Sequence, residues 1–158
     1  AIGFGHLSRC LAIAQAVTRA GGRSTLVSSR PIEAVAKLAE ERGLALAAVD
    51  ADPSSPEDAR ATLEATRDAD VVVVDGYAFD AAYMRALASR FTCYVDDLGR
   101  SLPCAAIVNH NFYGASVRYE LAADALRLAG PEYGIVADAF VDARARRTAA
   151  SAAGAFPR

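Results

Sequence analysis

The chain has 158 residues, and its 17 lysines and arginines nearly balance its 19 aspartates and glutamates, giving a formal net charge of −2. A chain of this length suits one domain that buries about 70% of the surface exposed in the unfolded state. The near-neutral charge excludes a global field that attracts nucleic acid, and no apolar run approaches the ~20 residues of a membrane span. We therefore expect neither a nucleic-acid partner nor a membrane span.

The first half of the chain predicts two helices and two short strands. Apolar residues recur at helical spacing after Leu7, and glycine or proline marks the ends of both helices. The expected elements are a helix from Leu7 that stops at Gly21, a strand over 24–28, a helix that Pro31 opens and Gly43 closes, and a strand over 44–49.

The second half repeats this alternation. Ser55 and Asp80 are expected helix N-caps, and the four consecutive valines of the strand over 70–75 predict a strand covered on both faces at the centre of a parallel sheet. The expected elements are a helix from Ser55 to about residue 67, a strand over 70–75, a helix from Asp80 to about residue 90, and strands over 91–96 and 105–109.

Strands that alternate with helices predict an α/β fold with a doubly wound, Rossmann-like parallel sheet, whose ligands bind beyond the carboxyl ends of the strands. A glycine turn such as the one at Gly3 normally follows a strand, so we expect a first strand that lies outside this sequence. Residues 1–147 are predicted to form the domain, and residues 148–158, rich in alanine, to begin an interdomain linker.

The glycine turn at Gly3 and Gly5 precedes a helix, where backbone N–H groups favour an anionic ligand and small residues allow its close approach. A nicotinamide site is disfavoured because Ser8 holds the third glycine position and no acid follows Ser28. His6 lies in the first helical turn, whose positive dipole disfavours an imidazolium ion. We interpret His6 as a general base, although a capping or core histidine explains the position too.

Polar residues follow several predicted strands and should converge with the glycine turn at one rim of the sheet. Arg9 lies three residues after His6, on nearly the same face of the predicted helix. There it either binds an anionic ligand group or pairs with an acid. Each strand end alone also has an explanation as a turn or a cap. The strand ends are Asp75-Gly76-Tyr77, Asp96-Asp97 and Asn109-His110-Asn111.

The sequence gives little support for a metal site, a cofactor or a serine or cysteine nucleophile. Cys10, Cys93 and Cys104 are scattered, and Asp96-Asp97 has no second acidic cluster, so no metal and no cofactor are expected. No serine or cysteine lies in a nucleophile elbow. The odd number of cysteines, with no close pairing motif, and the lack of a recognisable targeting signal predict a cytoplasmic protein.

Five motifs, taken together, resemble the nucleotide-sugar hydrolases of pseudaminic acid biosynthesis. They occur in the family's order and span residues 3–140, with His110 where the family usually has Gln. The motifs are Gly3-x-Gly5-His6-x-x-Arg9-Cys10-Leu11-Ala12, Val74-Asp75-Gly76-Tyr77-Ala78-Phe79-Asp80, Val95-Asp96-Asp97-Leu98, Val108-Asn109-His110-Asn111 and Gly130-Pro131-Glu132-Tyr133.

The resemblance implies one half of a glycosyltransferase-B-like fold, with UDP bound largely by a C-terminal nucleotide-binding domain that lies outside this sequence. The implied reaction is hydrolysis of UDP-2,4-diacetamido-2,4,6-trideoxy-altrose by water attack at the anomeric carbon, with His6 as the catalytic base and no metal. We expect these residues to be inactive without the second domain. The residues assigned to substrate binding are Gly3, Gly5, Arg9, Tyr77, Asp96, Asp97, Asn109 and Asn111.

Two other functions remain open at this point. An inverting glycosyltransferase would use nearly the same base on an acceptor hydroxyl instead of water. A noncatalytic module that binds a sugar nucleotide would use the same pocket without turnover.

Overall fold

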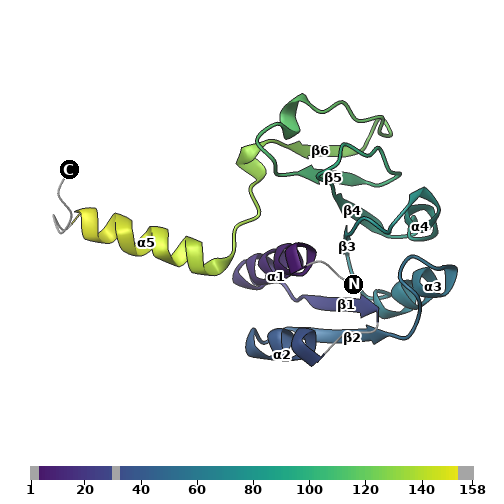
Figure 1. The fold of residues 1–158 in the computed structure, drawn as a ribbon, viewed down its shortest axis with the longest axis horizontal. Coiled ribbons are helices and arrows are strands. Elements are labelled where there is room, and N and C mark those ends of the chain that lie inside the picture. The colour runs from purple at the N-terminus through teal and green to yellow at the C-terminus, as the bar shows by residue number, and fades with distance from the viewer. Residues whose placement is uncertain (1–3, 30–32, 153–158) are drawn as a thin grey trace.

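The computed structural model describes residues 4–29 and 33–152, so Gly3 and Pro31 lie outside the described residues. Short strands alternate with helices along most of this part of the chain (Figure 1). The elements are α1 (Phe4–Arg19), β1 (Thr25–Ser29), α2 (Glu33–Glu41), β2 (Ala45–Val49), α3 (Pro56–Ala65), β3 (Val71–Asp75), α4 (Ala81–Ala86), β4 (Phe91–Val95), β5 (Ala106–Asn109), the 3-10 turn η1 (Gly114–Ser116), β6 (Leu126–Ala129), the 3-10 turn η2 (Pro131–Tyr133) and α5 (Asp138–Ala152).

All described strands are parallel, and they form two sheets. β1 pairs with β2, and the larger sheet has the order β3-β4-β5-β6. Helices α1 and α2 lie on one side and α3 and α4 on the other (Figure 1). Parallel strands with helices on both faces confirm the predicted α/β, Rossmann-like doubly wound fold.

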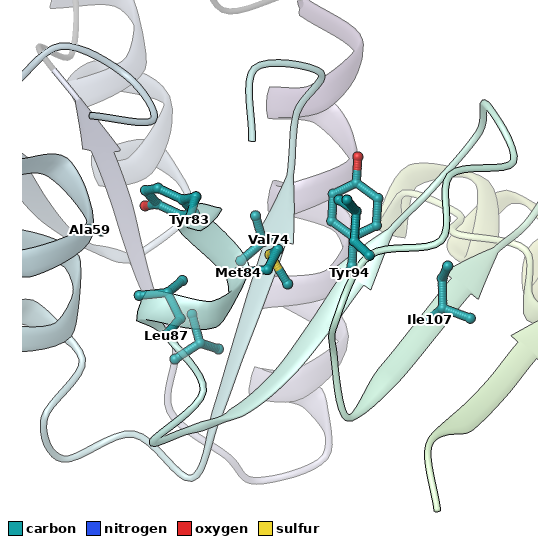
Figure 2. Close-up of a cluster of buried hydrophobic side chains, with 9 residues drawn as sticks. Ala59, Val74, Tyr83, Met84, Leu87, Tyr94 and Ile107 are labelled. Atoms are coloured by element: carbon teal, nitrogen blue, oxygen red, sulfur yellow. The ribbon is translucent and has the colours of Figure 1, made fainter. Parts of the chain in front are cut away.

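Two separate apolar clusters hold these layers together. In one, Leu7 and Leu11 of α1 pack with Leu26 of β1 and with α2. In the other, Met84 and Ile107 are fully buried between α3, α4 and the larger sheet (Figure 2). Because α1 packs against both β1 and β3, it connects the two sheets and brings its N-terminal turn to their carboxyl edge.

β3 differs from its prediction as a central strand covered on both faces. Within the described residues it is an edge strand of the larger sheet, and its buried and exposed positions alternate. Val72 and Val74 pack toward α3 and α4, whereas Val71 and Val73 on the other face are 50% and 36% exposed. An unbroken valine run therefore did not identify a strand that is covered on both faces.

The predicted N-caps are confirmed. Ser55 accepts a hydrogen bond from the Asp58 backbone N–H, with Pro56 at the first helical position, and Asp80 accepts one from the Tyr83 N–H. These bonds satisfy N–H groups that have no partner within the helix itself. α4 is nevertheless shorter than predicted, because it ends at Ala86.

We expect Ser55→Ala to lower the free energy of unfolding by about 1 kcal/mol, because it removes the acceptor for the Asp58 N–H. Ser55→Gly is the matched control, since glycine adopts the extended cap conformation and leaves the N–H accessible to water, at a cost of only a few tenths of a kcal/mol. Urea unfolding of both variants measures the difference, and equal losses would show that the side-chain bond does not stabilise α3.

The C-terminal part contains two elements that the sequence did not predict. β6 adds a fourth strand to the larger sheet, and α5 extends to Ala152, into the segment predicted to begin a linker. An ion pair between Arg19 and Asp138 joins the start of α5 to α1, and the rest of α5 extends away from the sheets (Figure 1). No helix within residues 4–29 and 33–152 is long and apolar enough to cross a membrane.

Candidate functional site

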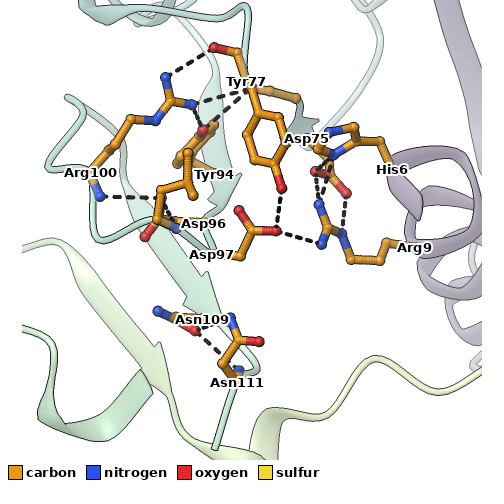
Figure 3. Close-up of polar contacts among 12 residues, drawn as sticks. His6, Arg9, Asp75, Tyr77, Tyr94, Asp96, Asp97, Arg100, Asn109 and Asn111 are labelled. Carbon is orange, nitrogen blue, oxygen red and sulfur yellow. Dashed lines mark hydrogen bonds and ion pairs between the residues drawn. The ribbon is translucent and has the colours of Figure 1, made fainter. Parts of the chain in front are cut away.

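Side chains from α1, β3, the β3–α4 loop and the β4–β5 loop meet at the carboxyl edge of the larger sheet (Figure 3). β3 ends at Asp75 and β4 at Val95, so the residues that follow both strands lie at the same rim. We call the group at this rim the rim cluster. Its members are His6, Arg9, Asp75, Tyr77 and Asp97.

Asp75 is at the centre of the rim cluster. Its side chain is 0% exposed, and its Oδ1 lies 2.7 Å from Nδ1 of His6. Arg9 donates from Nε to Oδ2 and from Nη2 to Oδ1, both at 2.7 Å. This two-bond pairing fixes both carboxylate oxygens, and it raises the pKa of the Arg9 guanidinium, mainly through the hydrogen bonds to Asp75.

Asp97 closes the other side of the rim cluster. Its Oδ2 accepts hydrogen bonds from Nη1 of Arg9 at 3.0 Å and from the Tyr77 hydroxyl at 2.9 Å. The hydrogen bond to Asp97 raises the pKa of the Tyr77 hydroxyl, which therefore stays protonated. The Tyr77 ring meets the His6 ring edge to face, with centroids 4.5 Å apart, and is 53% exposed. Tyr77 thus forms a surface-accessible wall beside the imidazole.

Asp96 and Asn109, both predicted to bind substrate, lie beneath the rim. Asp96 is 1% exposed and accepts from three backbone N–H groups of residues 98–100 and from the Tyr119 hydroxyl. Asn109 is 0% exposed, donates to Tyr119, and accepts from the backbone and side chain of Asn111. Both side chains use their polar groups within the chain, so they order the loops that carry Asp97 and Asn111.

A close backbone contact supports the position of Asn109. A Cβ at Gly114 would lie 2.5 Å from the Asn109 carbonyl oxygen, so only glycine allows η1 to pack against this residue. Asn111, at the surface end of the pair, lies apart from the rim cluster in Figure 3. The structure therefore separates the predicted residues into a rim cluster and an asparagine pair.

The glycine turn is only partly described. Gly3 lies outside the described residues, and Gly5 lies within the first turn of α1. A Cβ at Gly5 would meet no described atom within 4 Å, so there is open space beside this position. That space is compatible with a ligand near His6, as the sequence predicts.

The cations at the rim are already paired. Arg9 bonds to two carboxylates, and Arg100 donates to the backbone oxygens of Gly76, Tyr77 and Phe79 and to the Tyr94 hydroxyl. Arg9 is therefore not positioned as an anion-binding group, although the sequence assigned it to the substrate. Neither the Arg9 nor the Arg100 guanidinium is therefore unpaired and available to bind a diphosphate.

Neither a metal centre nor a thiol nucleophile stands out in residues 4–29 and 33–152. These residues contain no cluster of three or more His, Cys, Asp or Glu side chains arranged to hold a metal ion. Cys10, next to Arg9 in α1, has its pKa raised to about 12, first by burial and then by the charge of Asp75. At neutral pH it is a protonated thiol, which is a poor nucleophile.

Sequence reasoning placed Asp75 at the rim as a strand end without giving it a role in the site, and it missed Arg100. Asp75 was recognised as a strand end but not assigned to the site, because its partners His6 and Arg9 are 69 and 66 residues away. The signal that placed Asp75 at the rim, a polar residue that ends an apolar strand, could also have marked it as a site residue. For Arg100, whose partners are mostly backbone oxygens, the sequence offers no comparable signal.

Known proteins do not identify the family of this chain. No protein-family model matches the chain, and no curated protein matches it. The rim cluster and the sequence motifs are therefore the features that bear on the function of this chain.

Proposed function

We propose that this chain is the sugar-binding half of an enzyme that hydrolyses UDP-2,4-diacetamido-2,4,6-trideoxy-altrose, with His6 as the general base. The observation that carries the proposal is the 2.7 Å contact between Nδ1 of His6 and the buried Asp75 carboxylate, at the strand edge where ligands of this fold class bind. An imidazole bound through one nitrogen to a carboxylate has its other nitrogen available for a proton from water.

In the proposed reaction, the water oxygen attacks the anomeric carbon as the bond between that carbon and the UDP oxygen breaks. The bonding electron pair leaves with UDP, and the water proton passes to Nε2 of His6. Attack opposite the leaving group inverts the anomeric centre. Because a nucleoside diphosphate departs without protonation, a single base on the protein suffices.

The charge at the rim supports a sugar rather than a diphosphate beside His6. Arg9 is shared by the carboxylates of Asp75 and Asp97, and Arg100 by backbone oxygens. The carboxylate of Asp97 and the exposed Tyr77 ring suit hydroxyl or amide N–H groups and an apolar sugar face. We assign the diphosphate to a second domain beyond residue 158, as the sequence resemblance implies, and we place the enzyme in the cytoplasm.

Hydrolysis in oxygen-18 water tests the proposal directly. We expect the protein encoded by the complete reading frame to release UDP from the UDP-sugar and to place one labelled oxygen at the anomeric carbon, as measured by mass spectrometry. Label in UDP instead would mean attack at phosphorus.

Two further outcomes would contradict hydrolysis and favour a different function. Release of UDP only after an acceptor alcohol is added would indicate a glycosyltransferase. Saturable binding of the UDP-sugar without turnover would indicate a noncatalytic binding module.

A further inference from the structure

Nδ1 of His6 lies 2.7 Å from two different groups, Oδ1 of Asp75 and Nη2 of Arg9. If Nδ1 carries the ring proton, it donates to Asp75. If Nδ1 is bare, it accepts from Arg9, and the ring proton is on Nε2. The two arrangements give Nε2 opposite roles. With the proton on Nδ1, the bare Nε2 can accept a proton, and with the proton on Nε2, that nitrogen can only donate one.

The hydrogen-bonding capacity of Asp75 favours the first arrangement. The carboxylate is 0% exposed, so it has no access to water and depends on protein donors. Arg9 supplies one bond to each oxygen, which leaves Oδ1 a second lone pair that faces Nδ1. A bare Nδ1 at this distance would place two lone pairs against each other in a buried position.

The bonds of Arg9 point to the same arrangement. Its Nε and Nη2 donate to Asp75 and its Nη1 to Asp97, so two carboxylates already neutralise the guanidinium. Arg9 does not depend on the imidazole as an acceptor. The residual repulsion between Arg9 and a protonated Nδ1 is reduced by the same two negative charges.

We propose that Asp75 is a positioning residue for His6. Its carboxylate, clamped on both oxygens by Arg9, keeps the ring proton on Nδ1 and leaves Nε2 as the acceptor. Arg9 then acts through Asp75 rather than on the substrate. The tautomer follows from the contacts alone, whereas its use in catalysis rests on the proposed hydrolysis.

Nitrogen-15 NMR of the imidazole tests the tautomer without substrate. Spectra are recorded on the protein used for the turnover assay, at a pH above the ordinary imidazole range. The His6 signals are assigned by their loss in His6→Asn. We expect two-bond correlations typical of a proton on Nδ1. A proton predominantly on Nε2 would overturn the proposal and identify Arg9 as the donor to Nδ1.

Two matched variants distinguish the effect of the Asp75 carboxylate on the His6 tautomer from that of the Asp97 carboxylate. In Asp75→Asn, the amide oxygen pairs with Arg9 and the amide nitrogen faces Nδ1, so we expect the proton to move to Nε2 and kcat to fall about 10²-fold or more. Asp97→Asn removes the other acidic partner of Arg9 and should leave the Nδ1 tautomer unchanged. An unchanged tautomer in Asp75→Asn, or a changed one in Asp97→Asn, would overturn the proposal.

The result remains decisive if Asp75→Asn does not fold, because the unmodified protein and Asp97→Asn still report the tautomer. Failure of the two proposals is also distinguishable. A proton on Nδ1 without incorporation of labelled oxygen would contradict the hydrolase and retain the role of Asp75. Labelled product with a proton on Nε2 would support the hydrolase and contradict the role of Asp75.

Discussion

His6→Asn is expected to lower kcat for hydrolysis of the UDP-sugar by about 10²- to 10⁴-fold and to change KM by only a few-fold. Asn cannot accept a proton from water at neutral pH, so the loss falls on the transition state rather than on binding. The measurement is steady-state UDP release by the protein with its proposed second domain. Near-normal kcat in this variant would show that His6 is not the base.

His110→Asn is the matched control, since it makes the same replacement at the other histidine of the sequence. His110 follows β5 and has no hydrogen bond to the rim cluster, and its buried Nε2 has no hydrogen-bond partner in the part of the chain that the structure describes. We expect its kcat to remain within about twofold of the unmodified protein, as for a change away from the reacting groups. An equal loss in both variants would indicate damage to the fold instead of loss of a base.

Asp96→Ala is expected to lower the free energy of unfolding by about 3 kcal/mol, because buried donors lose a charged acceptor. The donors are three backbone N–H groups at 2.7–3.3 Å and the Tyr119 hydroxyl at 2.7 Å. The alanine side chain has no hydrogen-bond acceptor for these donors. Residues 98–100 would therefore lose the hydrogen bonds that shape the loop after β4. Urea unfolding with an unchanged slope measures the effect.

Asp68→Ala provides the control for Asp96→Ala. The Asp68 side chain is 92% exposed and, among the described residues, pairs only with the exposed Arg67, so we expect a change within about 0.5 kcal/mol. A loss below about 1 kcal/mol in Asp96→Ala would mean that the carboxylate is not an anchor for the loop. It would then be free for a ligand, as the sequence analysis predicted.

Local signals in the sequence predicted most of the elements. Ser55 and Asp80 marked helix starts because N-capping involves only residues within one turn. The pattern failed where contacts are distant. β6 contains Arg127 between two leucines, and its place in the sheet depends on pairing with β5, so a short, half-exposed strand gave little signal. α5 is rich in alanine and arginine, which favour helix without a core-facing stripe.

The candidate site was predicted in part. The sequence identified His6, Arg9, Tyr77 and Asp97, which the structure brings together at one rim. It also assigned Asp96 and Asn109 to the substrate, but these side chains are buried and bonded within the chain. A strand-end residue that faces inward and one that faces the rim look alike in a sequence, since burial depends on what packs around them.

By itself, the sequence determined the alternation of strands and helices, hence the parallel sheet and the edge at which polar strand ends collect. These features follow from local periodicity and from the chirality of parallel connections. Only the tertiary structure decided that Asp75 meets His6, and that Arg9 is held by carboxylates instead of remaining open to an anion. Such pairings join residues 66 to 88 positions apart, and their geometry exists only once α1 packs across β3.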